Sequence, residues 1–126
     1  MRVFWLSLIL IIILIVAGIF YLNMLEGKLS QIVLKIEGMF EKIHAKDWEG
    51  IKVEIEEVKK GWEDMSGFWS AFINHNKLDN IRVSMLRAEE YISMKNEVLA
   101  RAELSALKYL VENLYSSEKL KIWNIF

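Results

Sequence analysis

A run of twenty uncharged residues from Val3 to Leu22, VFWLSLILIIILIVAGIFYL, constrains this chain more than any other feature of its sequence. A helix of that length spans about 30 Å, which is the thickness of the hydrocarbon core of a bilayer. Aromatic residues stand near both ends of the run, where the interfaces of a membrane favour them. The run therefore predicts a transmembrane anchor in contact with lipid, with its ends marked by Val3, Phe4, Trp5, Phe20, Tyr21 and Leu22.

Two other structures compete with an anchor. The buried helix of a soluble protein rarely continues for this length without a charge. A cleaved secretory signal is the second alternative, because Ala17 and Gly18 are small residues near a suitable cleavage position. However, the apolar run continues as far as Leu22, and only Arg2 supplies a side-chain charge before it. We therefore expect an uncleaved signal-anchor.

The charges that flank the run predict its orientation. Arg2 and the free amine precede it, whereas Glu26 and Lys28 cancel one another after it. The positive-inside rule then places the N-terminus in the cytoplasm. We expect a single-pass protein of the cell membrane, with an anchor at residues 1–22 and an extracytoplasmic helical-bundle domain at residues 23–126.

Apolar residues in this second region recur at alternating spacings of three and four, which is the pattern of helices with one buried face. No segment alternates with the period of two expected of a half-buried strand, and the chain has no proline. The stripes are short and separated by turns, which favours packing within one chain over an intermolecular coiled coil. The predicted fold is all-α: an N-terminal transmembrane helix running into an antiparallel bundle of about four helices. The four stripes are Leu22, Leu25, Leu29, Ile32, Ile36, Met39 and Ile43; Trp48, Ile51, Ile55, Val58, Trp62, Met65, Trp69 and Phe72; Leu78, Ile81, Met85, Ala88 and Ile92; and Ala100, Leu104, Leu107, Val111 and Leu114.

Local signals predict where these helices begin, bend and end. Glycine weakens a helix, so Gly27 is the expected kink just outside the membrane. Side chains that accept hydrogen bonds from free backbone N–H groups favour helix starts. The expected boundaries are an N-cap at Asp47, a turn at residues 74–77 followed by capping residues Asp79 and Asn80, a cap at Ser93, and an end at Ser116 and Ser117.

The last seven residues, LKIWNIF, are the least typical segment, because five of them are apolar. Seven residues are too few for an independent helix. The segment is expected either to fold back into a groove between helices or to dock onto a partner or the membrane surface. The second alternative makes Trp123, Asn124, Ile125 and Phe126 candidate interaction residues.

Composition excludes several classes of function. Beyond Leu22 the chain carries 15 basic and 17 acidic residues, which is no basic footprint for nucleic acid. The absence of cysteine excludes thiolate metal sites, cysteine nucleophiles and disulfides. The two histidines, His44 and His75, are far apart in sequence, and no carboxylate pair is directed at a pocket. We expect no enzyme activity, no metal and no cofactor.

Two weaker candidates for ligand binding remain. His75 and Asp79 are four residues apart, with Asn80 beside them, and together they offer polar ligands, although a helix-capping turn is the simpler interpretation. Trp62 and Trp69 share a helix face with Trp48 and could stack on a sugar ring. Tryptophans at strict helical spacing more often belong to a core.

The chain also resembles a known family. The relevant residues are Asp47-Trp48-Glu49 leading to Trp62 and Trp69, the segment from His75 to Ile81, Tyr91-Ile92, Glu103-Leu104 through Leu107-Lys108, and the terminal Asn124-Ile125-Phe126. Together with the N-terminal anchor they resemble domain-of-unknown-function family 4363, small membrane-anchored proteins of Gram-positive bacteria. The resemblance implies no catalytic residues. It suggests partnership with a multi-pass membrane protein.

The expected function is therefore a non-enzymatic, membrane-anchored accessory protein that presents a helical domain to a membrane-protein partner. One alternative is a module that binds the cell wall or a small ligand. Another is a homo-oligomeric membrane scaffold built through the first stripe. The sequence leaves these alternatives open.

Overall fold

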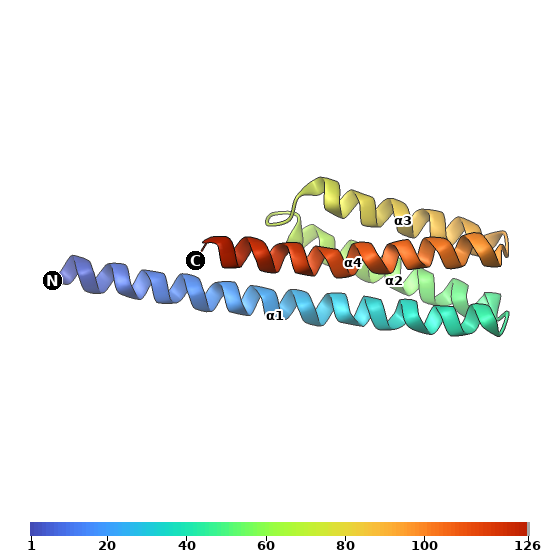
Figure 1. Ribbon diagram of the computed structural model, residues 1–126, viewed down its shortest axis with the longest axis horizontal. Helices are drawn as coiled ribbons and strands as arrows, with labels where there is room; N and C mark the ends of the chain where they lie inside the picture. Colours follow the sequence, from blue (N-terminus) through green and yellow to red (C-terminus); the bar gives the residue numbers. More distant parts are fainter. Residues whose placement is uncertain (126) are drawn as a thin grey trace.

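The computed structural model describes residues 1–125, which form four α-helices and no β-strand. The helices are α1 (Arg2–His44), α2 (Trp48–Trp69), α3 (His75–Ser93) and α4 (Glu97–Ile125). Successive helices run in opposite directions, and α4 closes the bundle by packing back against α1 (Figure 1). The predicted fold class, an antiparallel bundle of about four helices, is confirmed.

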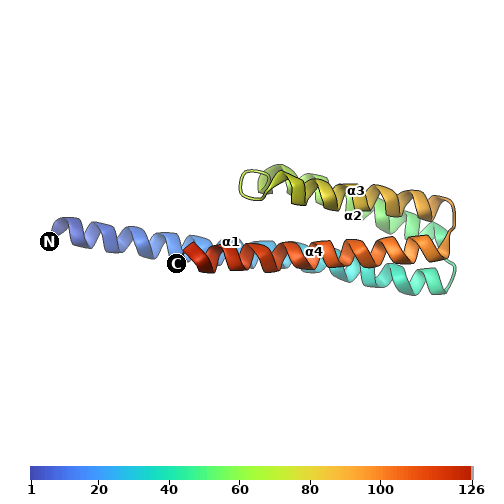
Figure 2. The same cartoon turned by 45° about the horizontal axis from the view of Figure 1, so that its top comes forward.

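Helix α1 is much longer than the bundle that it joins. Its N-terminal part projects beyond the other helices in both views (Figures 1 and 2), and burial begins only at Gly18. The expected kink at Gly27 is wrong, because α1 is one helix from Arg2 to His44. Leu25 and Leu29 are buried on either side of Gly27, and this packing outweighs the loss of about 1 kcal/mol that a helical glycine brings.

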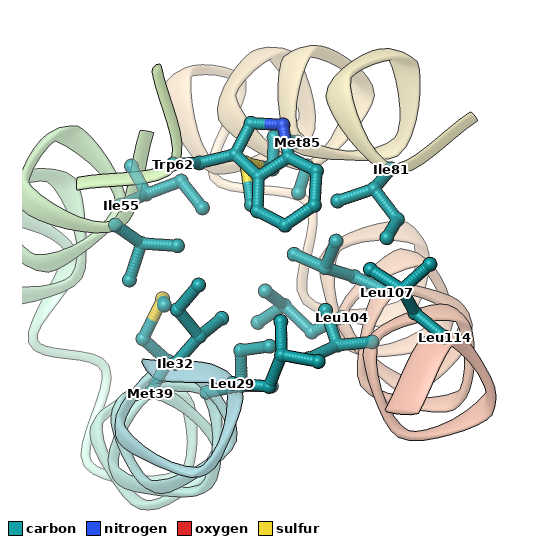
Figure 3. Close-up of a cluster of buried hydrophobic side chains, with 14 of the residues drawn as sticks. Leu29, Ile32, Met39, Ile55, Trp62, Ile81, Met85, Leu104, Leu107 and Leu114 are labelled. Atoms are coloured by element: carbon teal, nitrogen blue, oxygen red, sulfur yellow. The ribbon is translucent and has the colours of Figure 1, made fainter. Parts of the chain in front are cut away.

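The predicted stripes form the core. Trp48 is half-buried and Phe72 is exposed, whereas every other stripe residue is buried. Figure 3 shows side chains from all four helices converging, with Trp62 between α2 and the residues of α3 and α4. Phe72 fails as a core residue because α2 ends at Trp69, and Ile73 is buried in its place. Each fully buried Leu, Ile or Met contributes roughly 1.5–3 kcal/mol of transfer free energy.

Asparagine and aspartate residues begin the later helices. The predicted N-cap at Asp47 is confirmed, since its carboxylate accepts a hydrogen bond from the backbone N–H of Gly50. Asn74 caps α3 in the same way, through Asn76 at 2.8 Å. The turn predicted at residues 74–77 therefore lies too late in the chain: residues 75–77 are helical, and Asp79 and Asn80 lie within α3 rather than capping it.

Both serine-based boundaries of the last helix are wrong. Ser93 is the final residue of α3, and Asn96 caps α4 by accepting a hydrogen bond from Leu99 at 3.0 Å. Ser116 and Ser117 lie inside α4, where their hydroxyls donate to the carbonyls of Glu112 and Leu114. Serine is tolerated in a helix when its hydroxyl is bonded to the preceding turn in this way.

The expectation of a folded-back tail is also wrong. Residues 120–125 continue α4 as regular helix. Length was the wrong criterion, since the segment extends an existing helix and needs no nucleus of its own. Phe126 lies outside the described residues.

Candidate functional site

The two ends of the bundle differ, and the candidate site lies at the end beside the predicted anchor. We call it the anchor-proximal end. It comprises residues 17–24 of α1, residues 68–72 at the end of α2 and the start of the following turn, and residues 118–125 of α4. In Figures 1 and 2 the end of α4 lies alongside α1, part-way towards the N-terminus. A groove of about 450 Å³ opens here, lined by Ala17, Phe20, Tyr21, Met24, Phe68, Trp69, Phe72, Glu118, Lys121, Ile122 and Ile125.

Aromatic rings form one wall of this groove. Tyr21 packs edge-on against Trp69 with ring centroids 5.0 Å apart, and it lies 5.7 Å from Phe72. Phe68 contacts both Trp69 and Phe72, at 5.0 and 5.7 Å. Trp69 is buried behind these rings, whereas Phe68 and Phe72 are more than half exposed. Tilted and edge-to-face pairs at these distances are favourable, so the wall is an ordered apolar surface.

A small polar network fixes α4 against this wall. Glu118 is only 3% exposed, and its carboxylate accepts a hydrogen bond from the Tyr21 hydroxyl at 3.1 Å. The Lys121 ammonium lies 3.9 Å from the same carboxylate and donates to the backbone carbonyl of Phe72 at 3.0 Å. Three segments distant in sequence are thereby joined. A buried charge stabilises a fold only when partners such as these compensate its lost hydration.

Sequence reasoning missed Glu118. It stands four residues after Leu114, at the next position of the fourth apolar stripe. A carboxylate at a core position of a helical pattern is a signal for a buried polar contact, and the assumed end of the helix at Ser116 hid it.

The last turns of α4 carry three exposed apolar side chains. Ile125 lines the groove, whereas Leu120 and Trp123 lie on the other side of the helix, among the exposed polar residues Lys119 and Asn124. Trp123 and Ile125 are 67% and 66% exposed, and Leu120 is similarly exposed. Across the groove, Phe20 of α1 is also exposed. Large apolar side chains grouped in this way on a protein surface usually mark an interaction site.

The body of the bundle is polar outside and joined by ion pairs between neighbouring helices. Lys42 contacts Glu54 at 2.6 Å, and Lys59 contacts Glu89 at 3.0 Å. The hydrogen bond to Glu54 raises the pKa of Lys42, and the hydrogen bond to Glu89 raises that of Lys59. These contacts join α1 to α2 and α2 to α3. They lie away from the groove and serve the fold.

A second groove, of about 430 Å³, runs between α1 and α4. Glu26, Glu37 and Glu112 are among its lining residues, and the Tyr115 hydroxyl lies 3.5 Å from Glu26. Desolvation, together with the charge of Glu26, raises the pKa of Tyr115. Its acidic rim distinguishes this groove from the apolar one at the anchor-proximal end.

The structure separates the predicted site residues into three places. Trp62 lies in the core and is 1% exposed, so it offers no open stacking face. His75, Asp79 and Asn80 are exposed on the first turns of α3, and within residues 1–125 no group of three or more His, Asp or Glu could hold a metal ion.

The remaining candidates meet at the anchor-proximal end. Trp69 and Ile125 line the same groove, and Trp123 and Asn124 are exposed beside it. Phe126 is outside the described residues. The anchor residues divide similarly: Val3, Phe4, Trp5 and Phe20 are exposed, whereas Tyr21 and Leu22 pack into the bundle. The C-terminal part of the predicted anchor and the predicted interaction tail thus meet at one groove.

Comparison with protein families shows that residues 19–125 match a domain of unknown function, DUF4363. That range covers most of the chain and all of the bundle. The chain belongs to this family. The resemblance noted from the sequence is therefore confirmed, and the region matched begins beside Gly18, where α1 enters the bundle. Comparison with curated proteins and with solved structures gives no significant match.

Proposed function

We propose that this DUF4363 protein is a non-enzymatic accessory protein, anchored in the membrane by α1, that presents its helical bundle to a membrane-protein partner close to the bilayer surface. Helix α1 is long and apolar enough to cross a membrane. Residues 2–17 of this helix are exposed, which is unlike the core helix of a soluble protein.

The observation that carries the proposal is the continuity of α1. The helix passes from the apolar run into the bundle without a linker, and its buried stripe begins at the end of that run. A continuous helix transmits position and direction, whereas a flexible linker would let the domain diffuse. A bundle held in this way has a fixed height and a fixed face towards its neighbours in the membrane, which suits a contact with another integral protein.

The alternatives have less support. A ligand site on the tryptophan face needs an open surface, but Trp62 and Trp69 are 1% and 2% exposed. A scaffold assembled through the first stripe needs that stripe free, but Leu25, Ile36 and Met39 are buried within the chain.

The finer points of the proposal rest on the sequence. Arg2 before the span and the cancelling pair of Glu26 and Lys28 after it favour a cytoplasmic N-terminus and an extracytoplasmic bundle. The anchor is proposed to stay uncleaved, and an intact mass that includes residues 1–17 would support this. The family resemblance adds an origin in Gram-positive bacteria and a multi-pass partner.

The test is a pull-down of the tagged full-length protein from its native membranes in mild detergent, with mass-spectrometric identification of co-purifying proteins. We expect one integral membrane protein at near-stoichiometric amount. A reciprocal pull-down with that protein as bait should return this chain.

Two sets of variants locate the contact. In the first, residues 3–16 are permuted, which keeps an apolar span and leaves the bundle intact; the partner should be retained. In the second, a single glutamate replaces an exposed apolar residue of the bundle body at Leu34, Val53, Leu86 or Tyr109, and at least one change should release the partner. If the eluate of the unmodified full-length protein holds only the bait, the proposal is contradicted.

A further inference from the structure

We propose that the anchor-proximal end of the bundle is itself immersed in the lipid interface, so that the protein contacts the bilayer through the end of α4 and the α2–α3 turn as well as through its span. This inference rests on the proposed anchoring by α1. It assigns a lipid-binding surface to residues that are distant in sequence from the apolar run.

First, the end of α4 lies beside a part of α1 that belongs to the apolar run. The apolar run ends at Leu22, yet Ile122 and Ile125 line one groove with Ala17 and Tyr21. At a rise of about 1.5 Å per residue, Ala17 lies about 7 Å below Leu22 along the helix axis. If the run marks the hydrocarbon core, the last turn of α4 enters that layer from its surface. The polar network of Glu118 with Tyr21 and Lys121 holds α4 at this height.

The second argument is the chemistry of the exposed side chains at this level. Trp123 and Ile125 on α4, together with Phe68 and Phe72 beside the α2–α3 turn, are all more than half exposed. Aromatic residues concentrate where the headgroups meet the acyl chains. Lys119, one turn before Trp123, is exposed at the level expected of lipid phosphates.

The third argument is continuity, which selects lipid over a second copy of the chain. Ala17 and Phe20, which continue the exposed surface of residues 3–16, line the groove together with Ile122 and Ile125 of α4. Whatever solvates the span therefore also reaches this end. The turns at the opposite end of the bundle carry Lys46 and Lys95, and the exposed apolar side chains beside them, Met94, Val98 and Leu99, include no aromatic ring.

The backbone carbonyl groups at the end of α4 limit how deeply this end can enter the bilayer. The last four carbonyl groups of a helix have no partner within the helix, and such groups are costly in the hydrocarbon core. The interface, in contrast, supplies water and headgroup donors. The end of α4 is therefore placed in the outermost 5–10 Å of the apolar layer, the depth typical of interfacial helices.

The test measures depth in the bilayer at single residues. Because the chain has no native cysteine, the single variants Trp123→Cys, Ile125→Cys, Ile12→Cys and Val98→Cys each give one labelling site on the full-length protein. All four native side chains are exposed, so the fold should persist, and circular dichroism checks this. Each variant is spin-labelled and reconstituted in vesicles of phosphatidylethanolamine and phosphatidylglycerol. Its collision rates with oxygen and with a water-soluble nickel complex are then compared.

Ile12 is the standard for the span, and Val98, near the first turn of α4, is the standard for water. We expect Trp123 and Ile125 to collide with the nickel complex about tenfold less often than Val98, because polar complexes are excluded from the apolar layer. Ile125 should lie deeper than Trp123.

Two results overturn the inference in distinguishable ways. If Ile12 is in lipid while Trp123 and Ile125 are as accessible to nickel as Val98, the anchoring stands and the immersion is wrong. If Ile12 is also accessible to nickel, the anchoring itself is wrong, and the immersion fails with it.

Discussion

The two ends of this bundle are built on opposite principles. At the distal end, the connections α1–α2 and α3–α4 are three-residue turns, Ala45-Lys46-Asp47 and Met94-Lys95-Asn96, with the lysine at a φ of 58° and 56° respectively. Each turn ends in a residue whose side chain caps the next helix. The anchor-proximal end instead has a longer turn, an apolar groove and exposed aromatic rings.

This difference shows what each end is suited to do. The distal end satisfies backbone groups within its own turns, and it presents lysine side chains beside Met94 and Val98, which are exposed but carry no aromatic ring. The anchor-proximal end leaves apolar surface that only another apolar phase or protein would cover. One end therefore closes the fold, and the other continues the exposed apolar surface of the N-terminal part of α1.

The largest expected effect compares a core residue at the distal end with an exposed residue at the proximal end. Ile51 is fully buried and Ile125 is largely exposed. We expect Ile51→Ala to lower the free energy of unfolding by about 2–5 kcal/mol, because it leaves a cavity. The matched change Ile125→Ala should alter it by less than about 0.5 kcal/mol. Denaturant unfolding in detergent micelles, followed by circular dichroism, measures both. Equal effects would show that Ile125 packs as a core residue.

The polar network at the anchor-proximal end should give an intermediate effect. Glu118→Ala leaves the Tyr21 hydroxyl without its acceptor, and we expect a loss of about 1–3 kcal/mol. Tyr21→Phe keeps the ring packing but leaves the buried Glu118 carboxylate with only Lys121 at 3.9 Å, so we expect a loss of similar size. A double-mutant cycle between the two changes should yield a coupling of at least about 0.5 kcal/mol. Strict additivity would mean that the network does not hold α4 against α1.

The smallest effect is expected in the distal turns, and its sign is opposite. A non-glycine residue in the left-handed region is strained, so Lys46→Gly and Lys95→Gly should each stabilise the fold by about 0.5–1 kcal/mol. For a bundle of this size that corresponds to a rise in Tm of about 3–6 °C. Lys60→Gly in the middle of α2 is the control, and it should destabilise by about 1 kcal/mol. A fall in Tm for either turn variant would contradict the role given to these lysines.

The core was predictable from the sequence because helical periodicity is repeated over many positions. All residues from Leu22 to Ile43 in the first stripe are buried, and single exceptions do not obscure such a pattern. Boundaries depend on one or two side chains and were less predictable. Asp47 was identified as a cap, whereas Asn96 was missed in favour of Ser93. Both caps directly follow a lysine, in Lys46-Asp47 and in Lys95-Asn96.

The candidate site was only partly predictable. Trp69, Trp123 and Ile125 were singled out from the sequence, but nothing in the pattern indicated that they meet. Their proximity depends on α4 continuing past Ser116 and on Glu118 reaching Tyr21, which is 97 residues away in the chain. Contacts of that separation are set by the tertiary fold, so local sequence signals carry no information about them.

The central claim is that α1 is one rigid helix from the membrane into the bundle, and pulsed electron paramagnetic resonance tests it most directly. Spin labels on the double variant Ile12→Cys/Glu41→Cys lie at exposed positions on the two sides of Gly27. In vesicles, an unbroken helix gives one narrow distance distribution centred near about 44 Å, from 29 residues at about 1.5 Å each. A broad distribution, or one centred well below that distance, would show a hinge near Gly27 and would contradict the fixed placement of the bundle.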